Sequence, residues 1–381
     1  MKTRFDPLLQ ALLPLPLSRL YALAFRSPGA RERHDRALHL AEANLKLFAA
    51  TLAGRYRSLG LRSARVDAAL QKLVMPALGH WRDLAIETLF FLGEGCDAGS
   101  WAGRVLAFTL SPFGDAESRD ALAVLRSLAG WPGQPDTGPL GFLGVLPAYR
   151  NAMSGAHGGI KVDQGAYELG ASALLTLVRR IHRDGRLLGG ACLCLADEVR
   201  LDRDGSMKMT ALDLTGPSAI RRFQLEDADP SAGILPGSLY LETPTLERIS
   251  LHPFLWHQTL GASDRVLFLN RARDGAKGIV FLCYETGELH GLATAEGESA
   301  LARDVAQVLD WSKSHGSPTR IAATPRPWAM DDLFTRSDRF SDFLPGDRNE
   351  PDALDFQVIH LPGAGEAALR DGILRPGHRA P

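Results

Sequence analysis

The feature that most constrains the fold is a change in hydrophobic periodicity near residue 185. Before it, apolar residues recur every three or four positions, as they do on the buried face of a helix. The longest pattern covers residues 33–56, with Leu38, Leu45, Phe48 and Leu52 on one face. Shorter helical patterns follow at residues 66–74, 81–92, 121–128 and 167–181. The first half of the chain is therefore predicted to be helical.

After residue 185 the sequence changes to short runs that are typical of strands. Asp204-Gly205 and Asp274-Gly275 lie between such runs, and Asp-Gly favours tight hairpin turns. A later helix is predicted at residues 299–311. The expected strands cover residues 187–195, 207–214, 238–241, 265–269 and 278–284. Together these patterns predict an α+β protein whose strands are mainly antiparallel.

The patterns divide the chain into three predicted parts. Residues 1–185 are expected to form a helical bundle, and residues 186–311 a small β-rich domain with the late helix. Residues 312–381 are rich in Pro, Asp and Arg without a clear period, which predicts an irregular C-terminal extension. A chain of 381 residues is long enough to bury a core without disulfides or structural metals.

Composition excludes several classes of protein. The 43 Lys and Arg residues nearly balance 44 Asp and Glu, so the chain is not a wholly basic nucleic-acid coat protein. The four cysteines form no Cys-x-x-Cys pair, which fits a reducing cytoplasm better than a disulfide scaffold. No run reaches the roughly 18 apolar residues that a membrane span requires. We therefore expect a cytoplasmic protein without a membrane partner.

The strongest candidate for a functional site is Tyr149-Arg150-Asn151, which is followed a few residues later by His157. Glycines flank the histidine, and glycine allows a ligand or a second chain to approach the backbone closely. An arginine grips phosphate oxygens through its planar guanidinium, and a histidine moves protons near neutral pH. This stretch is therefore the candidate site.

Arg150-Asn151 and His157 also resemble the motif of the HEPN superfamily of small helical domains, in which an Arg and a polar residue precede a His. The wider sequence, about residues 10–290, is similar to the N-terminal regions of large bacterial signalling and conflict-system proteins. Ala156 separates Gly155 from His157, whereas that group usually has Gly directly before the His. The supporting segments are residues 15–21, 31–35, 41–47, 76–81, 251–255, 266–273 and 282–287.

The resemblance implies a dimeric endoribonuclease that needs no metal or cofactor and cleaves RNA through its own 2′-hydroxyl. Arg150 and His157 are then catalytic, while Tyr149 and Asn151 bind or orient the substrate. Many domains of this type use the motif only to fold or dimerise. The alternative is a non-catalytic sensor or adaptor that binds a separately encoded effector protein. Either version belongs to a bacterial defence or stress-signalling system.

Other residues are expected to have structural roles. His34 and His39 lie five apart, which is not the spacing that directs two helical side chains to one metal, so solvated or capping positions are expected. Trp81 is expected in the core. The sequence has neither a phosphate-binding loop nor a Gly-x-Ser-x-Gly elbow, which argues against an ATPase and a serine hydrolase.

Overall fold

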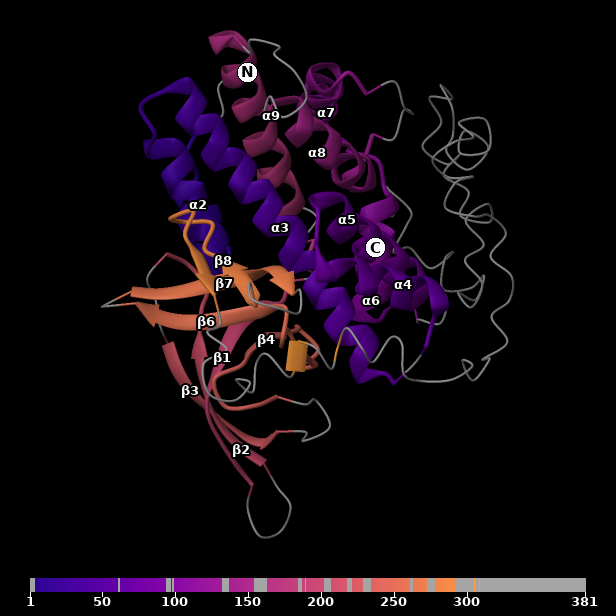
Figure 1. Cartoon of the computed structure of the whole chain (residues 1–381), viewed down its shortest axis with the longest axis vertical. Helices are drawn as coiled ribbons and strands as arrows, with labels where there is room; N and C mark the ends of the chain where they lie inside the picture. Colours follow the sequence, from indigo (N-terminus) through magenta and orange to yellow (C-terminus); the bar gives the residue numbers. More distant parts are fainter. Residues whose placement is uncertain are drawn as a thin grey trace, which may run out of the picture.

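In the computed structural model, helices come first along the chain and two antiparallel sheets follow, which confirms the predicted α+β class (Figure 1). In this view the helices occupy the upper and right-hand parts of the molecule and the strands the lower left. The structure describes residues 4–60, 62–93, 97, 99–131, 137–153, 163–183, 187–188, 190–201, 207–217, 221–228, 234–260, 263–272, 278–291, 304–305 and 308.

A long central helix, α3 (Ala30–Ser58), organises the helical part. It contains the predicted pattern at residues 33–56, and its apolar face is buried as expected. Helices α2, α5 and α9 pack against it. The other helices are α1 (Pro7–Leu12), α2 (Leu15–Arg26), α4 (Ala64–Gln71), the 3-10 turn η1 (Lys72–Val74), α5 (Leu78–Gly93), α6 (Trp101–Leu110), α7 (Ala116–Ala129), α8 (Pro139–Met153) and α9 (Gln164–Arg183).

Local sequence chemistry sets the ends of some of these helices, and α7 is the clearest example. Asp115 caps its start by accepting the backbone N–H of Ser118 at 2.7 Å. Gly130 ends it in the left-handed conformation, with φ of 58°, which glycine adopts without steric cost.

The strands form two sheets in which every pairing is antiparallel. The first has the order β3-β2-β1-β4-β5, and the second has the order β6-β7-β8-β9. The hairpins β1–β2 and β7–β8 join the strands on either side of the two Asp-Gly dipeptides, as predicted. The strands are β1 (Cys192–Leu201), β2 (Met207–Asp213), β3 (Arg221–Ala228), β4 (Leu239–Glu242), β5 (Arg248–Ser250), β6 (Leu255–Leu260), β7 (Ser263–Ala272), β8 (Ile279–Leu282) and β9 (Leu289–Gly291).

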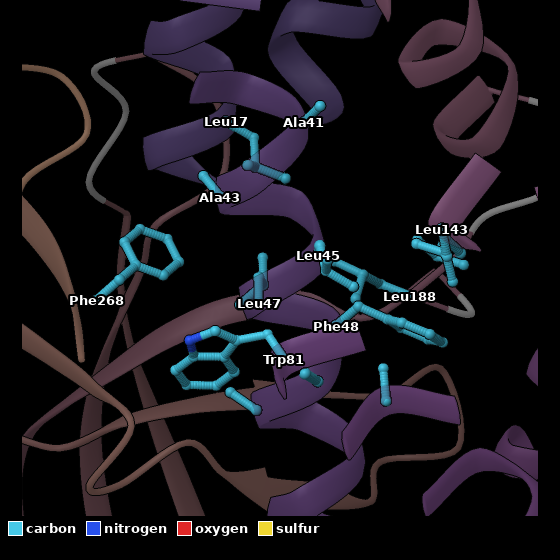
Figure 2. Close-up of a cluster of buried hydrophobic side chains, with 14 of the residues drawn as sticks. Leu17, Ala41, Ala43, Leu45, Leu47, Phe48, Trp81, Leu143, Leu188 and Phe268 are labelled. Atoms are coloured by element: carbon cyan, nitrogen blue, oxygen red, sulfur yellow. The ribbon is translucent and has the colours of Figure 1, made fainter. Parts of the chain in front are cut away.

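One continuous hydrophobic core joins the helices to both sheets. Figure 2 shows part of it, in which Leu17 of α2, Leu47 of α3, Trp81 of α5 and Phe268 of β7 lie close together. Trp81 is fully buried, as expected, and its ring lies edge-on to Phe254, with 6.2 Å between the ring centroids. The helices therefore bury part of their apolar surface against strands.

The predicted boundary at residue 185 lies between the end of α9 and the start of β1. The shared core crosses this point of the sequence. Of the late helix predicted at residues 299–311, the structure describes Asp304, Val305 and Val308, and both valines are buried. The predicted extension, residues 312–381, lies outside the described residues.

Candidate functional site

The predicted motif begins at the C-terminal end of α8. This helix is apolar for most of its length, and residues 139–146 are all buried. Close packing of that stretch fixes the direction in which the helix ends. Tyr149, Arg150 and Asn151 lie at this end, whereas His157 belongs to residues 154–162, which lie outside the described residues.

Tyr149 points into the helical bundle. Its side chain is fully buried, and its hydroxyl lies 2.7 Å from Nε2 of His34 on α3. Burial raises the pKa of the Tyr149 hydroxyl and lowers the pKa of the His34 imidazole, so both groups are neutral near pH 7. Gly170 of α9 packs so closely that a Cβ there would overlap the Tyr149 hydroxyl. Tyr149 thus ties α8 to α3 and α9 from inside the bundle.

Arg150 points the other way and is held by one strong contact. Its Nε lies 2.8 Å from Oε1 of Glu42 on α3. The Glu42 side chain is only 8% exposed, whereas the Arg150 side chain is 45% exposed. An ion pair this close, with a nearly buried carboxylate, restrains the guanidinium. Arg150 is therefore oriented from the inside and open to solvent on its other side.

Glu42 is itself surrounded by polar groups from α3 and from the second sheet. The hydroxyl of the buried Tyr284, which lies in the turn between β8 and β9, is hydrogen-bonded to Glu42. Lys46 lies one helical turn further along α3, with its Nζ 5.1 Å from the centre of the Tyr284 ring. The His39 ring also lies close to Tyr284, at 5.6 Å between centroids. We call His39, Glu42, Lys46, Arg150 and Tyr284 the Glu42 cluster.

The Glu42 cluster carries more positive than negative charge. Burial lowers the pKa of Lys46 to about 8, opposed by the nearby Glu42 carboxylate, so the ammonium is still mostly charged at pH 7. Burial also lowers the pKa of His39, which keeps that ring neutral. Two cations, Arg150 and Lys46, therefore face one carboxylate. An anion that reaches the exposed side of Arg150 meets positive charge that the cluster has not fully compensated.

The structure separates the side chains that the sequence placed together. Tyr149 is inside the bundle, Arg150 is at its edge, and Asn151 is exposed on the next position of α8. The structure does not define the position of His157 relative to Arg150, because His157 lies outside the described residues. The expectation that His34 and His39 are solvated or capping is wrong. His34 is buried against Tyr149, and the partly buried His39 has its ring tilted against that of Tyr284.

Sequence reasoning missed Glu42, Lys46 and Tyr284. A signal for the first two is present, because they are the only charged residues between positions 37 and 54. Two charges four residues apart in an otherwise apolar helix indicate a buried polar contact rather than a solvated face. Tyr284 had no comparable signal, since its partner lies in a distant part of the chain.

Within the described residues, no group of three or more His, Cys, Asp or Glu side chains is placed to hold a metal ion. Among the described helices, none is both long enough and apolar enough to cross a bilayer. No protein-family model, curated protein or solved structure matches this chain.

Proposed function

We propose that this chain is a cytoplasmic, metal-independent endoribonuclease that acts as a homodimer in a bacterial defence or stress-signalling system. The observation that carries the proposal is the state of Arg150. A buried carboxylate orients its guanidinium at the end of α8, and nearly half of the side chain stays open to solvent. An arginine that only closed a structural ion pair could be buried completely. An arginine that binds a phosphate must be both oriented and accessible.

The proposed reaction uses the nucleophile that RNA already carries. The 2′-hydroxyl attacks the adjacent phosphorus, and its proton passes to His157. The bond to the 5′-oxygen of the next nucleotide breaks, and that oxygen takes up the proton from the His157 imidazolium, which leaves a 2′,3′-cyclic phosphate and a 5′-hydroxyl. Arg150 stabilises the negative charge of the phosphorane as it forms. Lys46 adds long-range positive charge from inside the cluster.

The test is cleavage of RNA by Arg150→Ala and His157→Ala. Each substitution removes one of two groups that act on the same phosphate, so each should lower the rate about 100-fold or more. Arg31→Ala is the matched control, because Arg31 is a highly exposed arginine of α3 whose contact is a weak surface pair. Circular dichroism should show that all three variants are folded.

The same assay distinguishes the mechanism from metal-dependent hydrolysis. Activity should persist in EDTA and fall at acid pH, because a protonated imidazole cannot accept the proton of the 2′-hydroxyl. Loss of cleavage in EDTA, or full activity in His157→Ala, would reject the mechanism.

A second candidate is a sensor or adaptor that binds a separately encoded effector protein. The observation that favours it is the burial of Tyr149, which shows that part of the motif serves to hold the bundle together. In this case folded wild-type protein cleaves no RNA, even with its native trigger. Arg150→Ala should then weaken only self-association or retention of the effector, as measured by co-purification.

A further inference from the structure

The turn between β8 and β9 is fastened to the helical part at several points. The Glu285 carboxylate is nearly buried and pairs with Arg19 of α2 at 3.4 Å and with Arg265 of β7 at 3.3 Å. Its backbone carbonyl accepts a hydrogen bond from Arg36 of α3 at 2.8 Å. The residue before it, Tyr284, reaches Glu42. A displacement of this turn therefore acts directly on α2 and α3.

One of these contacts leads to Arg150. The Tyr284 hydroxyl is hydrogen-bonded to the Glu42 carboxylate, and that carboxylate forms an ion pair with Nε of Arg150 at 2.8 Å. Both Tyr284 and Glu42 are buried, so solvent does not readily replace the contact when it is lost. The ring of Tyr284 is also fixed by Phe268 of β7, at 5.4 Å between centroids. The position of the hydroxyl is thus set by the second sheet.

The outer side of the same turn is accessible. The side chain of Glu288 is 64% exposed, and the neighbouring Leu289 of β9 is also exposed. A molecule that binds there contacts the turn without entering the core. The second sheet thus has an open outer edge and an inner contact with the Glu42 cluster.

We infer that Tyr284 and Glu42 are positioning residues through which the second sheet sets the orientation of Arg150. A shift of the β8–β9 turn changes the hydrogen bond to Glu42 and so releases or tightens the guanidinium. The inference deepens the proposed ribonuclease and rests on it for its effect on activity. The contact between the sheet and Arg150 can be measured without any RNA.

The first experiment follows the Arg150 Nε–H by nitrogen-15 NMR of the whole chain, with the signal assigned by its absence in Arg150→Lys. Tyr284→Phe removes one hydroxyl and keeps the ring. It should speed solvent exchange of that proton about fivefold, the change expected when one buried hydrogen bond is lost from the network. Glu42→Gln should speed it at least as much.

Two matched variants serve as controls. Tyr240→Phe removes a buried hydroxyl from the first sheet. Glu247→Gln removes the charge of an ion pair between the turn that joins β4 to β5 and Arg55 of α3. Neither residue belongs to the Glu42 cluster, so both variants should leave Arg150 exchange at the wild-type rate. The inference would be overturned if solvent exchange of the Arg150 Nε–H were unchanged in Tyr284→Phe but faster in Glu42→Gln. The second sheet would then not act on Arg150.

The second experiment measures RNA cleavage by the same variants. With an active wild-type protein, Tyr284→Phe should lower kcat several-fold, in step with the faster exchange, while both controls keep wild-type kcat. An active Tyr284→Phe variant with unchanged kcat but altered exchange would overturn the regulatory part of the inference. Absence of cleavage by the wild type would reject the proposed ribonuclease, whereas the NMR experiment would still decide whether the sheet positions Arg150.

Discussion

At the scale of single residues, the charges buried in α3 are the main finding. Glu42 and Lys46 lie where a helix of this hydrophobicity would ordinarily place leucine or alanine. Burying an ion is unfavourable unless a partner compensates for the lost hydration. Glu42 has Arg150 and Tyr284 as partners, whereas Lys46 has two aromatic rings and the carbonyl of Leu269 at 3.4 Å. Charged side chains that are buried at such a cost in free energy are typical of a functional site.

Lys46 makes stability depend on pH in a defined window. Its pKa is about 8 in the folded protein and 10.5 as the ordinary value. Between these values the unfolded chain holds a proton that the folded chain has lost, so the free energy of unfolding rises with pH. The rise is at most about 3–4 kcal/mol, from roughly 1.4 kcal/mol per pKa unit. Below pH 8 both states are charged and the contribution is constant.

We predict that Lys46→Met abolishes this rise. Urea denaturation at pH 7 to 10.5 should show that the free energy of unfolding of the wild type rises relative to that of the variant as pH increases. Tyr284 faces Lys46 but has its pKa raised well above the ordinary value by burial, so it does not titrate in this window. Lys72→Met, at an exposed lysine, is the control and should run parallel to the wild type. Parallel curves for Lys46→Met would contradict the prediction.

The residues of the candidate site could be predicted from the sequence only where the signal was local. The spacing of Arg150 and His157 is visible along the chain, and so is the apolar run that buries α8. Glu42 and Tyr284 reach Arg150 through the packing of α3 and the second sheet. No local period encodes such long-range pairing, and the orientation of Tyr149 depends on the same packing.

At the scale of elements, the contact between α3 and β5 depends on a missing side chain. Gly54 of α3 lies so close to β5 that a Cβ would overlap the carbonyl oxygen of Ser250 and approach Ile249. The overlap is with backbone, which cannot move aside as a flexible side chain can. This glycine therefore sets how closely the helix approaches the first sheet.

We predict that Gly54→Ala destabilises the protein by about 2–4 kcal/mol, because the helix and the strand must separate. Gly79→Ala is the control, since Gly79 is also helical but has no heavy atom near its missing Cβ. That change should be neutral or stabilise by up to about 1 kcal/mol, through helix propensity alone. Chemical denaturation followed by circular dichroism measures both. Equal stability of the two variants would show that the close approach is not required.

Elements were predicted well where a regular hydrophobic pattern extended over many residues, and poorly where it extended over few. The helices α3 and α9 each contain a predicted pattern. The helices α1, α2, α6 and α8 and the strands β3, β5, β6 and β9 were not predicted. β5 and β9 have three residues each, too few to show alternation. β3 is mostly polar. These strands exist because neighbours pair with them and not because of their own sequence.

At the scale of the whole molecule, the shared core links the helices to the sheets. We predict that cutting the chain between α9 and β1 leaves two fragments that stay together. A protease site inserted at residue 185 tests this. After cleavage, the fragments should separate on a denaturing gel but co-elute in gel filtration, because apolar residues of both parts pack in one core. Separate elution would show that the common core does not hold the parts together.

The proposed ribonuclease also requires a second copy of the chain. We predict a dimer in sedimentation velocity at tens of micromolar, a range in which a specific interface of micromolar affinity or better is populated. The motivation is the glycine-flanked motif at the end of the buried helix α8, which allows close approach of two backbones. A monomer across this range would count against the proposed homodimer.

The common core also limits how this protein can be recombined with others. Trp81 on α5 and Phe268 on β7 belong to the same cluster, so each part exposes large apolar side chains when the other is removed. A gene fusion that transplants only the helices, or only the strands, would carry an unpaired and aggregation-prone surface. The portable unit is therefore the whole assembly of helices and sheets, and a functional chimera has to exchange both together.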